Sequence, residues 1–285
     1  MIQWKKLFTP VASLGAEEAK QYIDGHAEGA YTLLDVRQPW EYEEDHLPGA
    51  RLIPLAELNA RAGELDKTKP TLVYCAIGGR SRVAAQLLNG LGFADLYNLA
   101  GGIKAYRGFK VSGPQELNLD LVRGDESPGE ILVLAYGMEK ALKIFYDTVQ
   151  ARTQDWDLAG LCAMLGHIEE KHQERLWAQY QAVAGEQPDR RKFDLETVAL
   201  LLEGGFKLEE FLDRNQPWTK GVRDILELAM MLETQALDLY LRLARKLTAP
   251  ASKDILYGIA EEEKGHLAAL ARLLDERRPA PTGQG

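Results

Sequence analysis

Residues 130–146 read EILVLAYGMEKALKIFY, and residues 224–240 read DILELAMMLETQALDLY. The two stretches align at an offset of 94 residues, and isoleucine, leucine, alanine, glutamate and tyrosine recur at matching places. The same offset aligns Glu169-x-x-His172 with Glu263-x-x-His266. This half of the chain is therefore two copies of one helix hairpin, and residues 185–218 supply the long connection expected in a four-helix bundle with one crossover.

Helical spacing extends around these stretches and defines the bundle. Four long helices are predicted, at about 129–152, 157–184, 219–247 and 250–277. Between the second and the third lies 193–214, which we interpret as one or two short helices broken at Gly204-Gly205.

Upstream of the bundle the chain alternates strand-like and helix-like segments. Strands are predicted at 31–36 (YTLLDV), 71–75 (TLVYC) and 97–99, and helices at 16–23 and 81–91. This alternation predicts an α/β layer fold. The expected chain is thus multidomain, α/β plus all-α: an α/β domain at 1–112, a linker at 113–129, the four-helix bundle at 130–277, and a disordered Pro/Gly-rich tail at 278–285.

Composition limits the partners and the compartment. Residues 1–112 carry 13 basic and 13 acidic side chains and the remainder 21 and 30, so the whole net charge of −9 lies in the second part. An acidic half argues against nucleic acid as a partner, and no apolar run is long enough for a membrane span. With only two cysteines and no signal-peptide pattern at the start, we expect a cytoplasmic protein without disulfides or a four-cysteine metal site.

Each copy of the repeat carries a glutamate followed 30 residues later by Glu-x-x-His. Residues three apart share a helical face, and a buried carboxylate among apolar neighbours needs a compensating cation. Four carboxylates and two imidazoles directed into one bundle suit two iron or manganese ions. The alternative is a solvated run of charges, which repetition at a fixed offset disfavours. The predicted metal ligands are Glu139, Glu169, His172, Glu233, Glu263 and His266.

The first of the two cysteines ends a predicted strand and precedes Ala-Ile-Gly-Gly-Arg-Ser, after which a helix starts. A loop that turns into a helix N-terminus directs backbone N–H groups to one point, and such a site lowers the pKa of a thiol. We predict that Cys75 and Arg80 are catalytic, against the alternative of a buried structural cysteine. The loop residues predicted to bind substrate are Ala76, Ile77, Gly78, Gly79 and Ser81. Cys162 is predicted to be a small buried hydrophobe.

Here the sequence resembles a rhodanese domain over about residues 10–110. The matching stretches are LLDVRQPWEYEEDHLPGARLIPL (33–55), VYCAIGGRSRVAAQLL (73–88) and NLAGGIKAY (98–106). The resemblance implies a sulfurtransferase without a cofactor, in which Cys75 takes sulfur from a sulfane-sulfur donor and passes it to a thiol acceptor. It also implies that Asp35 and Arg37 form a framework beside the site. The six-residue loop has the length associated with sulfur, whereas the related phosphatases and arsenate reductases use a longer one.

The helical part, about 130–276, resembles the rubrerythrin family of the ferritin-like superfamily, on the pattern of Glu and Glu-x-x-His that occurs twice. The resemblance implies a di-iron (or di-manganese) carboxylate site that reacts with peroxide or dioxygen. It also implies an external donor that supplies the electrons. Rubrerythrins carry a further ligand carboxylate near the third-helix glutamate. Here Met230 and Ala236 stand three residues on either side of Glu233, so the sequence predicts no seventh ligand.

Three functions stay open on the sequence. The first is a sulfurtransferase fused to a redox-active di-metal domain. The second is a plain sulfurtransferase whose bundle binds metal or dimerises without turnover, with a homodimer as one alternative. The third is a non-enzymatic carrier of iron or persulfide.

Overall fold

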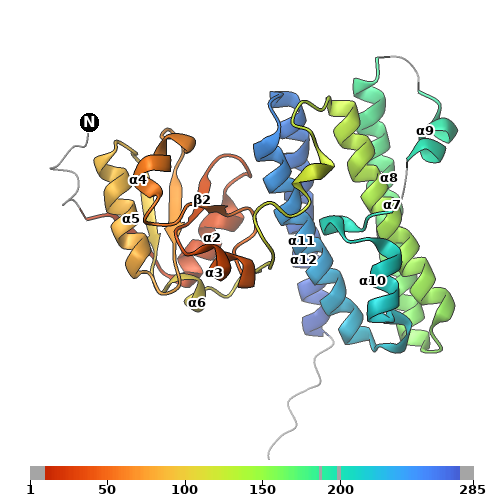
Figure 1. The fold of residues 1–285 in the computed structure, drawn as a ribbon. Coiled ribbons are helices and arrows are strands. Elements are labelled where there is room, and N and C mark those ends of the chain that lie inside the picture. The colour runs from red at the N-terminus through yellow and green to blue at the C-terminus, as the bar shows by residue number, and fades with distance from the viewer. Residues whose placement is uncertain (1–9, 186–187, 198–199, 277–285) are drawn as a thin grey trace, which may run out of the picture. The chain divides into compact units, whose positions relative to one another are not determined.

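The structure is a computed structural model that describes residues 10–185, 188–197 and 200–276. The chain divides into two compact units, residues 1–119 and 120–285. The first unit combines a sheet with short helices and the second is almost wholly helical (Figure 1). Both parts of the predicted fold class are confirmed.

The first unit is built on a five-stranded parallel sheet. Its strands are β1 (Ala12–Leu14), β2 (Thr32–Asp35), β3 (Arg51–Leu52), β4 (Thr71–Tyr74) and β5 (Leu96–Leu99). Their spatial order is β1-β5-β4-β2-β3. The strand that precedes Cys75, β4, is central and buried along its length, as expected of a strand covered on both faces.

Helices cover both faces of this sheet, and two separate apolar clusters result. They are α2 (Ala16–Gly25), α3 (Pro39–Glu44), α4 (Leu58–Arg61), α5 (Gly79–Gly90) and α6 (Gly102–Ala105), with a 3₁₀ turn at Ala62–Glu64. On β4, Val73 belongs to the cluster under α4 and α5, whereas Leu72 and Tyr74 belong to the cluster under α2, α3 and α6. This is the alternation of side chains along a strand.

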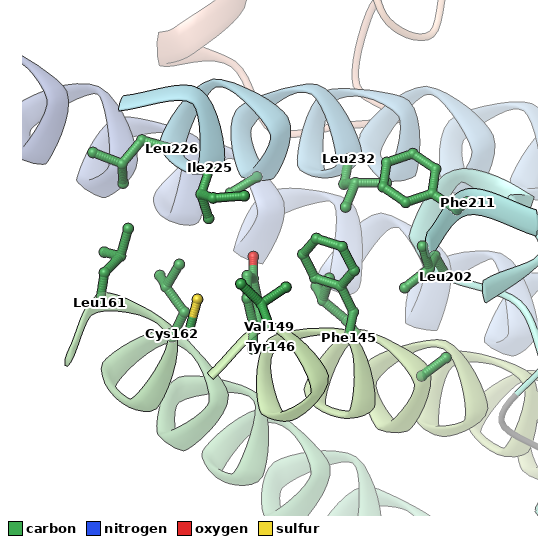
Figure 2. Close-up of a cluster of buried hydrophobic side chains, with 14 of the residues drawn as sticks. Phe145, Tyr146, Val149, Leu161, Cys162, Leu202, Phe211, Ile225, Leu226 and Leu232 are labelled. Atoms are coloured by element: carbon green, nitrogen blue, oxygen red, sulfur yellow. The ribbon is translucent and has the colours of Figure 1, made fainter. Parts of the chain in front are cut away.

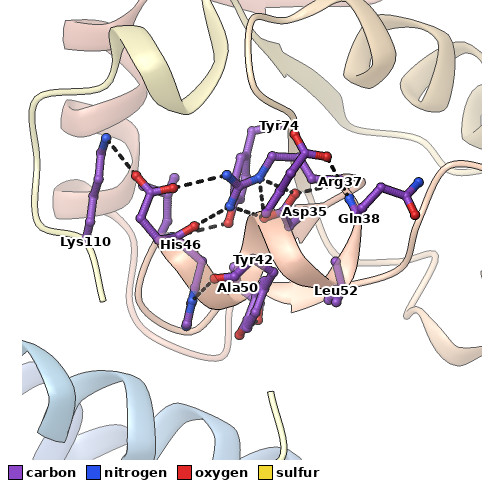
Figure 3. Close-up of polar contacts among 12 residues, drawn as sticks. Asp35, Arg37, Gln38, Tyr42, His46, Ala50, Leu52, Tyr74 and Lys110 are labelled. Carbon is purple, nitrogen blue, oxygen red and sulfur yellow. Dashed lines mark hydrogen bonds and ion pairs between the residues drawn. The ribbon is translucent and has the colours of Figure 1, made fainter. Parts of the chain in front are cut away.

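A buried ion pair fastens β2 to the loop beyond α3 (Figure 3). Arg37 Nη2 donates to Asp35 Oδ2 at 2.8 Å, and Arg37 Nη1 donates to Asp45 Oδ1 at 3.1 Å. Asp35 and Arg37 are both buried. Asp35 and Arg37 are therefore paired with each other inside the first unit, which agrees with the framework that the resemblance implies.

The second unit contains the two predicted hairpins. They consist of α7 (Pro128–Arg152) with α8 (Trp156–Val183), and α11 (Val222–Lys246) with α12 (Pro250–Glu276). Side chains cap the first two helices: Ser127 Oγ accepts from Glu130 N, and Asp155 accepts from two N–H groups of α8. The crossover carries α9 (Arg190–Glu196), η3 (Glu203–Gly205), α10 (Leu208–Asn215) and η4 (Pro217–Thr219).

An apolar cluster at one end of the bundle joins all four long helices to the crossover (Figure 2). Tyr146 and Val149 of α7 lie opposite Ile225 of α11 there, and the ring of Phe145 contacts that of Phe211 of α10. Cys162 of α8 belongs to this cluster and is fully buried, and burial raises the pKa of its thiol to about 12. The prediction that Cys162 is a small buried hydrophobe is confirmed.

The division between the units falls inside the predicted linker 113–129. On one side Gln115 Oε1 accepts from Leu52 N at 2.7 Å. On the other, Gly124 O accepts from Thr248 N at 2.8 Å and Glu126 O accepts from Ser252 Oγ at 2.7 Å. Each half of this segment is thus hydrogen-bonded to its own unit. The tail predicted at 278–285 lies outside the described residues. Among the helices of the described residues, none is both long enough and apolar enough to span a membrane.

Candidate functional site

Cys75 lies directly after β4, and its buried side chain belongs to the apolar cluster under α4 and α5. The backbone N–H of Gly78 donates to Cys75 Sγ at 3.1 Å, and Ser81 Oγ lies 3.4 Å from the same sulfur. Gly78 has φ +92°, a left-handed conformation that glycine adopts without strain. The loop therefore turns tightly enough to direct its donors at the sulfur.

These donors change the acidity of the thiol. Burial acts to raise the pKa of Cys75, but hydrogen bonds from the Ser81 hydroxyl and from the N–H groups of Ser81, Ile77 and Gly78 outweigh it and lower the pKa. The N-terminus of α5 contributes in the same direction because its free N–H groups favour an anion. A thiolate is the nucleophilic form of cysteine, so the arrangement activates Cys75.

The turn that begins α6 holds this loop through two backbone hydrogen bonds. Ile103 N donates to Cys75 O at 2.9 Å and Lys104 N to Ala76 O at 3.2 Å, both from α6. At Gly102, φ is +60° and a Cβ would lie 2.3 Å from Cys75 O. Only glycine fits there, which gives a physical reason for the second glycine of NLAGG.

The predicted catalytic Arg80 is engaged by a carboxylate that sequence reasoning missed. Its guanidinium donates to both oxygens of Glu41, from α3, at 2.6 Å each. This pairing, through the Arg80 hydrogen bonds above all, lowers the pKa of Glu41 to about 2. Arg80 also interacts with Cys75, which helps to raise its own pKa. The positive charge beside the sulfur is thus partly neutralised.

In the bundle, the six predicted ligands gather as two matching groups. Glu139, Glu169 and His172 form one, and Glu233, Glu263 and His266 form the other; within each group, one potential ligand atom per residue lies within 4.8 Å of the others. The two imidazoles stack, with ring centroids 4.0 Å apart. The repeat in the sequence therefore becomes a pair of facing half-sites.

Five of these residues are buried and His266 is half-buried, and several carboxylate oxygens have no hydrogen-bond partner. Glu169 Oε2, Glu233 Oε2 and Glu263 Oε1 are in this state. Glu169 Oε2 does lie 2.9 Å from His172 Nδ1, but it accepts no hydrogen bond there. Carboxylate oxygens and imidazole nitrogens that lie this close without hydrogen bonds between them are arranged as ligands around a shared metal ion. The oxygen and imidazole donor set fits a pair of iron or manganese ions.

A seventh candidate ligand comes from the crossover and corrects the prediction of six. Glu203, at the start of η3, is 1% exposed and groups with Glu139 and Glu263. Tyr240 donates its hydroxyl hydrogen to Glu203 Oε1 at 3.2 Å. Gly204 follows with φ +79°, and a Cβ there would lie 2.6 Å from Gln235 Cβ of α11. The Gly-Gly turn therefore packs against α11 and lets Glu203 reach the cluster.

The buried carboxylates differ in acidity. Burial raises the pKa of Glu139, Glu203 and Glu263 well above the ordinary value, and the neighbouring carboxylates add to the effect. Burial, and then Glu233, raises the pKa of Glu169 to about 8. For Glu233 burial acts in the same direction, but hydrogen bonds from Glu263 and His266 outweigh it and lower the pKa. The carboxylates of the cluster repel one another when they are ionised, and a bound cation would offset that repulsion.

Comparison with known proteins places both units. The family model of the rhodanese-like domain matches residues 16–108. A thiosulfate sulfurtransferase, GlpE, of Coxiella burnetii is 39% identical over 75 residues, which are 26% of this chain and 70% of that protein. The chain belongs to the rhodanese-like family.

Two further relatives of the rhodanese-like domain come from Bacillus subtilis. The uncharacterized protein YqhL is 46% identical over 76 residues, 27% of this chain and 60% of that protein. The putative sulfur carrier protein YrkF is 34% identical over 98 residues, 34% of this chain and 52% of that protein. The chain thus spans less than two thirds of either relative.

The rubrerythrin family model matches residues 224–283, so a rubrerythrin domain follows the rhodanese-like domain. The match covers α11 and α12 and includes Glu233, Glu263 and His266. The first hairpin lies outside it, but the 94-residue repeat relates its three ligands to these. The fused architecture of a rhodanese-like and a rubrerythrin domain is confirmed, and a rubrerythrin domain implies binding of a di-iron pair.

The residues that sequence reasoning missed in each domain carried weak signals. Glu41 of the rhodanese-like domain lies in a run of charged residues, and nothing in the run indicates which one faces Arg80. Glu203 stands between an apolar run and a Gly-Gly pair, a pattern that indicates a turn but not the direction of the carboxylate. Tyr240 is fully buried, and it donates its hydroxyl hydrogen to the Glu203 carboxylate.

Proposed function

We propose that the rhodanese-like domain is a sulfurtransferase that carries sulfur as a persulfide on Cys75. The observation that carries the proposal is the set of N–H and hydroxyl donors directed at Cys75 Sγ, which lowers the pKa of the thiol. The relative named as a thiosulfate sulfurtransferase supports the same activity.

Two displacements account for the reaction. The Cys75 thiolate attacks the outer sulfur of a donor such as thiosulfate; a bond between the two sulfurs forms, and the sulfur–sulfur bond of the donor breaks, with its electron pair leaving on sulfite. An acceptor thiolate then attacks the outer sulfur of the persulfide and regenerates the Cys75 thiolate. The loop N–H groups stabilise the negative charge at the sulfur in each resting state.

The test compares the two cysteines of the chain. Incubation with thiosulfate or a low-molecular-weight persulfide should add one sulfur atom to Cys75, seen by peptide mass spectrometry, and a thiol acceptor should remove it over many turnovers. Cys75→Ser should abolish both effects, and Cys162→Ala should keep them. Persulfide formation without multiple turnover would instead indicate a carrier, the role in the name of a second relative. No sulfur on Cys75 with any donor would refute the proposal.

A second function, of the rubrerythrin domain, is favoured by a separate observation. Seven side chains, six of them buried and His266 half-buried, form three overlapping groups that could hold metal ions. Two iron ions held by them would supply electrons for the reduction of peroxide or dioxygen, replenished by an external donor. In this proposal the two Glu-x-x-His pairs hold one ion each, Glu139 and Glu233 complete the half-sites, and Glu203 adds a carboxylate on one side. Tyr240 holds Glu203 in place through its hydroxyl.

Metal analysis tests this function before any activity is measured. The isolated protein, or protein loaded with Fe(II) without oxygen, should hold about two metal ions per chain. Glu169→Gln should lose metal, whereas Glu170→Gln, one residue along on the exposed side of α8, should retain it. A protein that binds two irons but leaves peroxide unreacted would reduce the bundle to a binding domain. Failure to take up either metal would remove the oxidoreductase function altogether.

A further inference from the structure

A cavity of about 320 Å³ lies between α8 and α12, and its inner end is formed by candidate metal ligands. Glu169, Glu233 and His266 line that end. The volume falls in the range of sites for small organic molecules. Hydrogen peroxide and dioxygen would fill only a small part of it, so the cavity is larger than either molecule needs.

The walls of the cavity are apolar. Leu165 and Ile168 contribute from α8, and Leu270 and Leu273 from α12. Each pair is three residues apart and so lies on one face of its helix. Two such faces opposite each other form a slot that favours a hydrocarbon chain over water.

The outer end of the cavity carries one basic and one acidic side chain, Arg272 and Glu276, one turn apart on α12. Arg272 is exposed, and it forms no ion pair with another residue in the described part of the chain. A free guanidinium is well suited to bind a carboxylate through two hydrogen bonds. The inner end, with its two glutamates, disfavours an anion. A bound molecule with one anionic end would therefore place that end at Arg272, the one basic residue that lines the cavity.

We infer that this cavity binds a medium-chain aliphatic carboxylate, with its chain between α8 and α12 and its carboxylate at Arg272. The inference rests on the proposed metal-dependent function, because a molecule in this cavity would lie beside the proposed metal centre. Binding itself depends on the apolar walls and on Arg272, and so it can be measured with or without metal.

Calorimetric titration of the full chain with octanoate, octanol and acetate provides the first test. Octanoate should bind at one saturable site, octanol roughly tenfold more weakly because it lacks the charge, and acetate not measurably. Arg272→Gln should weaken octanoate binding roughly tenfold and leave octanol unchanged. Lys253→Gln removes the same charge from the same helix roughly 28 Å away and should have no effect on either ligand.

A matched pair of alanines tests the location. Ala269 lines the cavity and its neighbour Ala268 does not, although both are exposed. Ala269→Trp should abolish octanoate binding, and Ala268→Trp should preserve it. Equal binding by the two variants, or no saturable binding by the parent chain, would overturn the inference. A third result would also overturn it: a parent chain that is a dimer and binds no octanoate, and that becomes a monomer in Ala269→Trp but not in Ala268→Trp. The slot would then be a subunit interface.

Metal content, measured on the same samples, separates this inference from the proposed function. A protein with about two metal ions but no octanoate site would contradict the inference alone. A protein that binds octanoate but takes up no metal would contradict the metal-dependent function and leave the cavity as a ligand site.

Discussion

The Ser81 hydroxyl lies 2.6 Å from Asn98 Oδ1 and 3.4 Å from Cys75 Sγ, and it has one proton to donate. Ser81→Ala removes the donor from the sulfur, so the pKa of Cys75 should rise. At any pH below that pKa the thiolate fraction should fall, and with it the rate of alkylation by iodoacetamide, by roughly five- to tenfold. The two rates should converge at high pH, where both thiols are ionised.

Ser13→Ala is the control for this variant. Ser13 Oγ accepts from Asn98 Nδ2 at 3.2 Å, so the substitution removes a hydroxyl from the same network without touching the sulfur. Its pH profile should match that of the parent chain. An unchanged profile in Ser81→Ala would show that the backbone N–H groups alone set the acidity of Cys75.

A second prediction at this scale concerns the carboxylate that occupies Arg80. Because its pKa is lowered to about 2, Glu41 is ionised over the whole working range of pH and repels anionic donors. Glu41→Gln should free the Arg80 guanidinium and lower the KM for thiosulfate by roughly two- to fivefold, with little change in kcat. Steady-state kinetics at low salt measure both constants.

Glu44→Gln removes an exposed charge from the same helix and serves as the control. A rise in KM for Glu41→Gln, with no change for Glu44→Gln, would contradict this prediction. It would show that Glu41 holds Arg80 in its working position, and that the ion pair is needed for donor binding.

At the scale of elements, the turn between β5 and α6 sets the shape of the sulfur-binding loop. Gly102→Ala places a Cβ 2.3 Å from Cys75 O and 2.5 Å from the Ala76 carbonyl carbon. We expect a loss of about 3 kcal/mol of folding free energy together with slower sulfur transfer, since the loop must move. Gly92→Ala has a positive φ but nothing near its Cβ, and it should lose only about 1 kcal/mol and no activity.

Urea unfolding measures both variants of this pair. If Gly102→Ala is no less stable than Gly92→Ala and transfers sulfur at the parent rate, the loop tolerates displacement. In that case the support that α6 gives to Cys75 is not required for its chemistry.

The elements that the sequence predicts are those with a sustained pattern. The three predicted strands correspond to β2, β4 and β5, and the four long helices to α7, α8, α11 and α12. The two strands missed, β1 and β3, have three and two residues. They are too short to show a period, and only their neighbours in the sheet define them.

The same reasoning explains which site residues were found. The six predicted metal ligands are one set of three that occurs twice at a fixed offset, so the repeat reveals them. Glu203 occurs once, in a 3₁₀ turn of the crossover, and the repeat gives it no counterpart in the bundle. Its role depends on the packing of Gly204 against α11, a tertiary contact that no local pattern predicts.

At the scale of the whole molecule, the bundle buries more carboxylates than it can neutralise by itself. Four of the five carboxylates of the candidate metal cluster have a raised pKa, so the folded metal-free bundle binds more protons than the unfolded chain. A raised carboxyl pKa gives stability that is present at low pH and lost as pH rises. The metal-free bundle should therefore lose stability from about pH 5 to pH 8, at roughly 1.4 kcal/mol per pH unit for each such group.

Metal should reverse this dependence. The ligands bind as carboxylates, so metal uptake releases protons and strengthens as pH rises, and bound metal stabilises the folded bundle by mass action. Thermal melts of the full chain, followed by the helical circular dichroism signal with and without Mn(II), should diverge between pH 5 and pH 8. Parallel curves would show that these carboxylates do not bind metal. Glu169→Gln, which removes one raised group, should flatten the metal-free curve and shrink the gain from metal, whereas Glu170→Gln should change neither.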